Sequence, residues 1–349
     1  MTLLTDALAA YTYKLPQEAI ALSPAEPRDS SRLLIYDRTD GTTRCDTFVH
    51  LSSYLPPDSL LIFNDTKVIP ARIIAHLRSG GAVALLCYEL NEHAHTFEAL
   101  SPRRLPVGTV LTVSTHTTVR VTQVHDEGYT CSYDTGISFL SLLQTYGTTP
   151  LPPYLKQSPL SELERRTRYQ SLFAREGTSA AAPTASLHFT KRLVDTLLHD
   201  GHAIGFVRLT VGLGTFAPLS DRNLTEQKLH SENYEIPKET LTLLREALRD
   251  GRPIIPVGTT ALRALESASS YLEGSDVQSV FRSSTRLFIQ EGYRFRIASG
   301  LITNFHVPES SLMMLVAALI GRQKLLELYT HALRNNFRFL SFGDAMLIR

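Results

Sequence analysis

Apolar positions along this chain occur in two patterns, continuous runs and positions with helical spacing, and these patterns predict its main elements. Continuous apolar runs at residues 59–63 and 254–257 are typical of buried strands, whereas residues 193–198 place leucine and valine on one helical face that ends at Gly201. Strands and helices alternate in this way through the second half, and we expect a last strand at residues 337–342. This βαβ order predicts an α/β (mixed α+β) domain with a mostly parallel sheet.

The pattern differs between residues 68 and 149. Short β-type runs, among them residues 73–77, 83–88 and 109–113, are separated by turns that contain glycine and show no helical period. Many short strands at close spacing predict a small β-barrel-like domain. We therefore predict two domains, a discontinuous α/β domain of residues 1–67 and 150–349 and an inserted β-domain of residues 68–149.

Composition narrows the class of protein. The 349 residues carry a net charge of +1, so a polyanion would have to be met by a local patch of charge. Cys45, Cys87 and Cys131 lie far apart, which argues against a disulfide framework and a cysteine zinc site and fits a reducing cytoplasm. The longest apolar run, residues 312–320, is less than half of the roughly 20 residues that span a bilayer. We expect a cytoplasmic protein with no metal and no membrane partner.

One stretch, residues 301–311, combines several groups that can bind a ligand. Thr303, Asn304 and His306 stand in an extended segment that Pro308 ends, and Ser310 or Ser311 can cap the apolar helix that follows. A helix start presents free N–H groups and a positive dipole end, which suit carboxylates and phosphates. The alternative is a loop that enters a buried helix, with His306 structural.

Two further segments place polar groups beside predicted elements. His188 follows a run of small residues that includes Thr184 and precedes a helix, where a neutral imidazole suits a general base; the alternative is a tightly packed crossover. Asn64 and Asp65 end a predicted buried strand, the place where open α/β sheets bind ligands, although a simple turn is as compatible with the pattern.

The remaining candidates are less specific. Arg28 and Arg32 flank Asp29 in a loop that suits a carboxylate or phosphate, or forms a surface ion-pair loop. His230 and Asp344 could act as acid or base, or belong to a turn or cap. The glycine turn at residues 212–216 lacks the third glycine and the helix start of a dinucleotide site, and no P-loop, GxSxG or HExxH motif is present.

Eight segments in one order carry a family resemblance that covers residues 15–348. They are LPQEAIALSPAEPRDSSRLL, LLIFNDTKVIPARI, RYQSLFAREGTSAAAPTASLHFT, VGLGTFAPL, LHSENYEI, GTTALRALESA, LITNFHVPESSLMMLVAALIG and FRFLSFGDAMLI. The chain resembles the S-adenosylmethionine:tRNA ribosyltransferase-isomerases of the queuosine pathway. It departs from the family pattern at Ser186, Thr210, Gln227, Glu291 and Ser299.

The resemblance implies that the ribosyl part of S-adenosylmethionine is transferred to 7-aminomethyl-7-deazaguanine in tRNA and isomerised to give epoxyqueuosine-tRNA, with release of adenine and methionine. S-adenosylmethionine is then a co-substrate, no cofactor is tightly bound, and the enzyme is expected to be a monomer. With the resemblance as guide, we predict catalytic roles for His188, His306, Asp344 and His230. We predict substrate contacts for Arg28, Asp29, Arg32, Asn64, Asp65, Arg72, Thr184, Thr259, Thr303 and Asn304, and tRNA contacts for Arg103, Arg104, Arg165, Arg166 and Arg168.

Two other functions compete with this prediction. An S-adenosylmethionine-dependent RNA methyltransferase would use the same co-substrate, but the sequence lacks a convincing glycine-rich cofactor loop. A non-catalytic RNA-binding protein built on the β-insert is disfavoured by the near-zero net charge.

Overall fold

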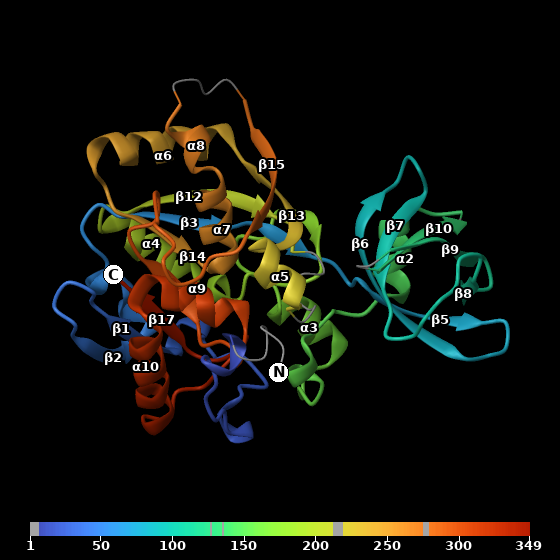
Figure 1. Cartoon of the computed structure of the whole chain (residues 1–349), viewed down its shortest axis with the longest axis horizontal. Coiled ribbons are helices and arrows are strands. Elements are labelled where there is room, and N and C mark those ends of the chain that lie inside the picture. Colours follow the sequence, from blue (N-terminus) through green and yellow to red (C-terminus); the bar gives the residue numbers. More distant parts are fainter. Residues whose placement is uncertain (1–6, 126–127, 135, 212–218, 275–278) are drawn as a thin grey trace.

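The computed structural model describes residues 7–125, 128–134, 136–211, 219–274 and 279–349, so the glycine turn at residues 212–216 lies outside the described residues. The larger domain is built on a nine-stranded sheet of order β15-β13-β12-β3-β14-β16-β17-β1-β2 (Figure 1). Its strands are β1 (Arg32–Tyr36), β2 (Thr43–Thr47), β3 (Leu60–Asn64), β12 (Ala203–Leu209), β13 (Lys228–Ile236), β14 (Ile254–Val257), β15 (Phe281–Leu287), β16 (Leu301–Asn304) and β17 (Ala345–Ile348).

The centre of this sheet is parallel, which agrees with the predicted α/β class. Strands β12, β3, β14 and β16 run in one direction, and β17 pairs in parallel with β1. Antiparallel pairs join β16 to β17 and add β13, β15 and β2 toward the edges. The carboxyl ends of β3, β12, β14 and β16 therefore meet at one edge of the sheet.

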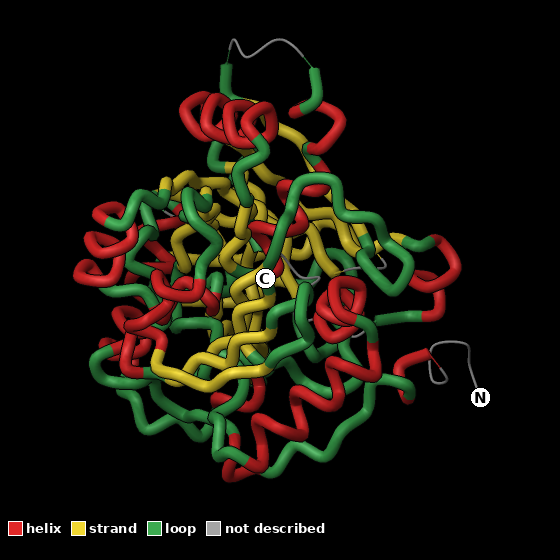
Figure 2. The backbone as a smooth tube through the Cα atoms, turned by 90° about the vertical axis from the view of Figure 1, so that its left-hand side faces the viewer, coloured by secondary structure: helices red, strands yellow, loops and turns green. Residues whose placement is uncertain are grey.

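Helices cover both faces of the sheet (Figure 2). In β3, Leu60 and Ile62 pack in one core with α6 (Lys238–Asp250) and α7 (Thr259–Ser267), whereas Leu61 and Phe63 pack on the opposite face with α4 (Lys191–His199). This alternation follows from the two-residue period of a strand and makes both faces apolar. The helices of the larger domain are α3 (Glu162–Arg168), α4 (Lys191–His199), α5 (Asp221–Glu226), α6 (Lys238–Asp250), α7 (Thr259–Ser267), α8 (Ser269–Leu272), α9 (Ser311–Ile320) and α10 (Arg322–Arg334).

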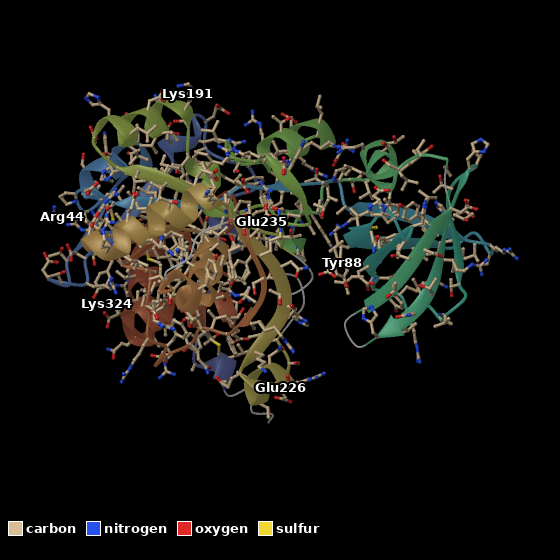
Figure 3. All side chains as sticks on the ribbon, turned by 90° about the horizontal axis from the view of Figure 1, so that it is seen from above. Arg44, Tyr88, Lys191, Glu226, Glu235 and Lys324 are labelled. Atoms are coloured by element: carbon tan, nitrogen blue, oxygen red, sulfur yellow. The ribbon has the colours of Figure 1, made fainter. Side chains whose placement is uncertain are left out.

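The predicted β-insert is a closed six-stranded barrel of order β10-β7-β6-β5-β8-β9. It stands beside the larger domain, and Tyr88 of β6 lies on the side of the barrel that faces this domain (Figure 3). The pattern had missed β7, β10 and the helix α2, whose Phe139 stacks on Phe97 in the barrel core. The elements are β5 (Arg72–Leu77), β6 (Ala82–Asn91), β7 (Thr96–Leu100), β8 (Val110–Ser114), β9 (Thr117–His125), β10 (Gly128–Asp134) and α2 (Phe139–Tyr146).

The barrel joins the larger domain through a short neck in which the outgoing and returning chains lie side by side. Arg72 and Thr148 exchange two backbone hydrogen bonds of 3.2 and 2.8 Å. Beside them, β4 (Thr66–Val68) pairs with β11 (Glu176–Ser179) in a separate two-stranded sheet. Arg166 of α3 donates to the carbonyls of Gln144 and Gly147 at the end of α2. The neck is therefore held by both backbone pairing and a side-chain contact between the domains.

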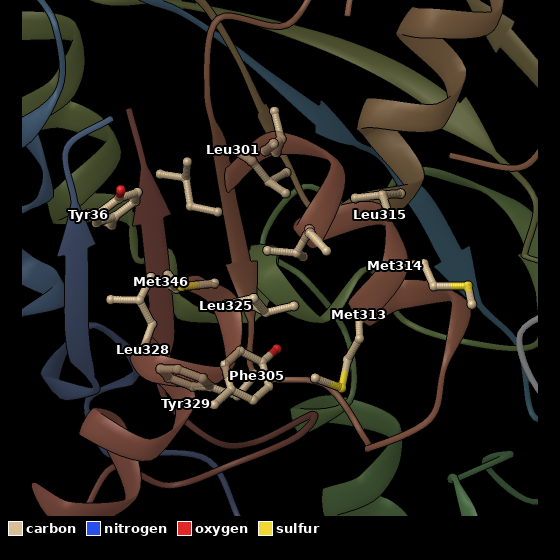
Figure 4. Close-up of a cluster of buried hydrophobic side chains, with 14 of the residues drawn as sticks. Tyr36, Leu301, Phe305, Met313, Met314, Leu315, Leu325, Leu328, Tyr329 and Met346 are labelled. Carbon is tan, nitrogen blue, oxygen red and sulfur yellow. The ribbon is translucent and has the colours of Figure 1, made fainter. Parts of the chain in front are cut away.

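The apolar run behind the polar stretch forms α9, as expected, and Ser310 is its N-cap because its hydroxyl accepts from the N–H of Met313. Met313, Met314 and Leu315 pack with side chains of α10 and the sheet in the largest core cluster (Figure 4). Gly321 separates α9 from α10.

The predicted strand at residues 337–342 is wrong, because the last strand is β17. Residues 337–344 form a loop in which Leu340 has a φ of 71°, outside the extended range of a regular strand. Phe337 and Phe339 produced the apolar signal, but both point into the core, where Phe339 stacks on Phe305 with ring centroids 4.6 Å apart. Gly343 lets the loop close on the carbonyl of Arg338, since a Cβ there would lie 2.5 Å from that oxygen.

Candidate functional site

A cavity of about 460 Å³ opens at the sheet edge where the parallel strands end. Its wall is formed by the carboxyl ends of β14 and β16, the first turn of α7, and the short 3₁₀ helix Thr184–His188 (η5). Residues 152–154 and 340–341 close it from the other side. The volume falls within the range of about 300–1,000 Å³ that is typical of small-molecule sites.

Five residues predicted from the sequence line this cavity, although they come from three segments separated by up to 122 positions. Thr184 lies on η5, Thr259 begins α7, and Thr303, Asn304 and His306 belong to the polar stretch after β16. The topology brings these segments to one sheet edge, as expected for ligand sites of open α/β sheets.

His306 is held in one orientation at the cavity wall. Its Nε2 lies 3.0 Å from the hydroxyl of Thr303, its backbone N–H donates to the phenol of Tyr329 at 2.9 Å, and its carbonyl accepts from Tyr13. Burial lowers the pKa of the ring from 6.5 to about 4, so His306 is neutral at pH 7. A neutral, fixed imidazole beside a cavity can accept a proton from a bound substrate.

His188 is buried as well, but it does not line the cavity. Its Nδ1 lies 2.8 Å from the hydroxyl of Ser31, and its Nε2 lies 3.2 Å from Nδ2 of Asn304. Burial lowers the pKa of its ring to about 3, helped by the charges of Arg338 and Arg28. Because both ring nitrogens already have partners, this geometry favours a positioning role toward Asn304 and leaves His306 as the better candidate for the base.

The loop at residues 28–32 lies outside the cavity, and its charges bind protein groups. Asp29 is buried and accepts two bonds of 2.6 Å from Arg192, besides one from Thr190 at the start of α4. Arg28 donates to carbonyls at the end of α3, and Arg32 donates to the carbonyl of Asn335 while its guanidinium lies 4.0 Å from the ring centroid of Phe337. These contacts match the ion-pair alternative for this loop.

Asp344 also acts within the fold. Its carboxylate accepts from the backbone N–H groups of Arg32 and Arg338 at 2.9 and 2.7 Å and pairs with the Arg338 guanidinium at 3.3 Å. It ties the loop before β17 to the start of β1, outside the cavity.

Asn64 and Asp65 lie beneath the cavity rather than in its wall. Asn64 uses both ends of its amide, because it donates to the carbonyl of Leu209 at 3.0 Å and accepts from the N–H of Leu209 at 3.1 Å. Asp65 is buried and pairs with Arg208 at 3.0 and 2.9 Å. Both residues fix neighbouring strands at the end of β3.

The other predicted residues are distributed over the molecule. Arg72 lies in the neck and donates to the carbonyl of Leu151 at 3.4 Å, and His230 is half-buried in β13, where the sequence had suggested a turn or cap. Of the five arginines predicted to contact tRNA, Arg165, Arg166 and Arg168 make contacts within the protein, whereas Arg103 and Arg104 are exposed on the barrel.

The sequence reasoning missed Arg263, which lines the cavity one turn after Thr259. Arg263 is 7% exposed, and its Nη1 pairs with Glu232 of β13, itself 4% exposed. Its segment, GTTALRALESA, had contributed to the family resemblance, and the four-residue spacing to Thr259 could have placed both on one face of the helix.

We expect Glu232→Gln to lower the free energy of unfolding by about 3–5 kcal/mol, because it leaves the Arg263 guanidinium buried without its counter-charge. Urea unfolding at pH 7 measures this. The matched control is Asp195→Asn, which breaks the exposed pair with Lys191 on the outer surface (Figure 3) and should cost less than about 1 kcal/mol. Equal losses in the two variants would contradict the importance of the buried pair.

Ser186 departs from the glycine of the family pattern and is fully buried in η5, where its hydroxyl has no hydrogen-bond partner among the described residues. We expect Ser186→Ala to raise the free energy of unfolding by about 1 kcal/mol, since it removes a buried polar group that makes no bond. Ser31→Ala serves as the control and should lower it by a similar amount, because the Ser31 hydroxyl bonds to His188. A less stable Ser186→Ala protein would show that the hydroxyl has a partner.

Among the described residues, no group of three or more His, Cys, Asp or Glu side chains is placed to hold a metal ion, and no helix is long and apolar enough to cross a membrane. The structure therefore defines a mixed α/β protein with a large sheet, a closed six-stranded barrel and a cavity of small-molecule size. The chain belongs to the family described as queuosine biosynthesis protein, whose model matches residues 8–348.

Relatives of nearly full length support this assignment. The chain is 40% identical to the S-adenosylmethionine:tRNA ribosyltransferase-isomerase of Fusobacterium nucleatum over 98% of its own length and 96% of the relative. It is 42% identical to the protein of the same name from Carboxydothermus hydrogenoformans, over 98% and 99%. The crystal structure of S-adenosylmethionine tRNA ribosyltransferase from Thermotoga maritima is similar, with a TM-score of 0.56, 31% identity and coverage of 97% of this chain and 100% of that one.

Proposed function

We propose that this chain is an S-adenosylmethionine:tRNA ribosyltransferase-isomerase, a transferase of queuosine biosynthesis. It moves the ribosyl group of S-adenosylmethionine to 7-aminomethyl-7-deazaguanine in tRNA and isomerises it, with release of adenine and methionine. One observation carries the proposal: in a chain about 40% identical to proteins of that name, five polar residues from family segments converge on one cavity.

The chemistry requires a base near the sulfonium and a proton for the departing adenine. The sulfonium acidifies the C5′ hydrogens of S-adenosylmethionine, so a positioned base can remove one and form an ylide. His306 fits this role, because its ring is neutral, fixed by Thr303 and part of the cavity wall. The hydroxyls of Thr184, Thr259 and Thr303 and the amide of Asn304 supply contacts for ribose hydroxyls and the base edge.

A product assay tests the proposed reaction. The protein is incubated with S-adenosylmethionine and tRNA that carries 7-aminomethyl-7-deazaguanine, and free adenine, free methionine and the modified nucleoside are measured together. We expect all three in equal amounts. S-adenosylhomocysteine as the product would identify a methyltransferase, and tRNA binding without any product would identify an RNA-binding protein.

We place the tRNA-binding surface on the barrel around Arg103 and Arg104, because both side chains are exposed. We expect the double change Arg103→Glu and Arg104→Glu to weaken tRNA binding at low salt and to reduce the slope of log affinity against log salt by about 2. Arg249→Glu on α6, on the side of the larger domain away from the barrel (Figure 1), is the control and should leave binding unchanged. Unaltered binding in the double variant would remove the barrel arginines from the interface.

Further parts of the proposal concern the organisation and state of the enzyme. We place the domain boundaries at residues 68 and 149, on either side of the neck, and take the enzyme to be a cytoplasmic monomer without a tightly bound cofactor. The paired chains at Arg72 and Thr148 support these boundaries. Light scattering coupled to gel filtration tests the monomeric state, and mass spectrometry of the native protein tests for a bound cofactor.

A further inference from the structure

The first turn of α7 presents backbone donors to the cavity. α7 follows β14 directly, and its N-cap is Gly258, which has a φ of 92° and offers no side chain to cap the helix. The N–H of Gly258 is used by the carbonyl of Ile302, but the N–H groups of Thr259 and Thr260 meet no acceptor among the described residues. An uncapped helix start of this kind attracts negative charge.

Arg263 adds a cationic group to this helix start. Its Nη1 pairs with Glu232 and its Nε donates to the carbonyl of Leu287 at 3.1 Å, so two of its three nitrogens are occupied. Its Nη2 is buried and has no hydrogen-bond partner in the described part of the chain. A guanidinium nitrogen left unsatisfied inside a cavity wall costs free energy unless a ligand accepts from it. Arg263 therefore offers a hydrogen-bond donor to an acceptor group of a ligand at this end of the cavity.

A complementary acceptor lies on the facing strand. Nδ2 of Asn304 contacts the carbonyl of Leu340 at 3.1 Å and the Nε2 of His188 at 3.2 Å, which fixes the amide so that Oδ1 is the free end. This Oδ1 is buried and has no partner among the residues described. Val257 and Ile302 pair across β14 and β16, so Asn304 stands close to the start of α7. A ligand with a hydrogen-bond donor can therefore bind to Oδ1 of Asn304.

We infer that the start of α7, Arg263 and Asn304 form a subsite for an α-amino acid group, in which Thr259, Thr260 and Arg263 bind the carboxylate and Asn304 Oδ1 accepts from the ammonium. Given S-adenosylmethionine as the substrate of the proposed function, this group is its methionyl end. The substrate would then lie with its amino acid group at α7 and its ribose beside His306. The carboxylate would also reach a donor set that neither adenosine nor 5′-methylthioadenosine can engage, because both lack the amino acid group.

Ligand analogues test this subsite with the protein unaltered. S-adenosylhomocysteine, its carboxylate methyl ester, its deamino analogue and 5′-methylthioadenosine are compared by calorimetry. We expect the ester and 5′-methylthioadenosine to bind at least 100-fold more weakly than S-adenosylhomocysteine, because charge-assisted bonds to Arg263 are lost, and the deamino analogue to bind about 10-fold more weakly. Similar affinities for all four compounds would overturn the inference.

Arg263→Lys provides a matched variant, because lysine retains the charge facing Glu232 but lacks the forked second nitrogen. It should weaken S-adenosylhomocysteine binding at least 10-fold and leave 5′-methylthioadenosine binding unchanged. An equal loss for both ligands would indicate a structural role and overturn the assignment. If the anion is instead an RNA phosphate, an anticodon stem-loop will compete with S-adenosylhomocysteine and the ester will bind normally. The product assay tests the proposed function separately from this subsite. If only the subsite assignment is wrong, the unaltered protein still releases adenine and methionine.

Discussion

Replacement of His306 by asparagine is expected to lower kcat by about 10²–10⁴-fold, the contribution usual for a general base. The ring lies in the cavity wall, Thr303 and the two tyrosine contacts fix it, and burial keeps it neutral at pH 7. Asparagine retains a polar amide but cannot take up a proton at this pH. S-adenosylmethionine affinity should change little, because the variant removes no charge from the cavity.

His202→Asn is the matched control for this variant. His202 is also buried, and burial also lowers the pKa of its ring, but it lies just after α4 and does not line the cavity. Turnover should remain within a few-fold of the unaltered enzyme. A folded His306→Asn protein that releases adenine at the normal rate would show that another group is the base.

Acidification below pH 6.5 is expected to destabilise the larger domain through its two buried histidines. In the unfolded chain such a ring has a pKa near 6.5, whereas His188 and His306 have values of about 3 and about 4 in the folded protein. Below pH 6.5 the unfolded state therefore binds more protons, and the free energy of unfolding falls by up to about 1.4 kcal/mol per pH unit for each ring. This loss continues toward pH 4 for His306 and toward pH 3 for His188.

His188→Gln isolates one of these contributions. Urea unfolding between pH 6 and 4.5 should give a shallower decline for the variant, by up to about 1.4 kcal/mol per pH unit, because glutamine does not titrate. Its stability at pH 7 is expected to be lower, since contacts to Ser31 and Phe48 are lost. Parallel curves for the two proteins would mean that His188 becomes charged in the folded state.

The sequence predicted the fold class and part of the site for different reasons. The apolar runs at β3 and β14 are continuous because helices cover both faces, so the α/β class could be read from their period. His306 and His188 looked equivalent, since each stands near a predicted helix start. The structure separates them through Ser31 and Asn304, partners that lie 157 and 116 positions from His188.

Arg263 shows why the rest of the site could not be predicted. Its significance depends on Glu232, which lies 31 positions earlier on a strand that the sequence had suggested was a turn or cap. Asp29, Arg32 and Asp344 had the residue types of a binding or catalytic site, yet their charges bind protein groups in loops and at a helix start. Residue type alone does not distinguish a side chain that binds a ligand from one that binds the backbone.

The position of β17 between β16 and β1 has a consequence for biosynthesis on the ribosome. β1 begins at Arg32, but its parallel partner β17 begins at Ala345. The ribosome therefore releases β1 long before β17, the strand that pairs with the edge of β1 opposite β2. The barrel strands, which lie between residues 72 and 134, are complete much earlier and close the barrel by pairing with one another. The barrel can therefore fold during translation, whereas the central sheet must wait for its last strand, and until then the apolar β1 presents an open edge to chaperones.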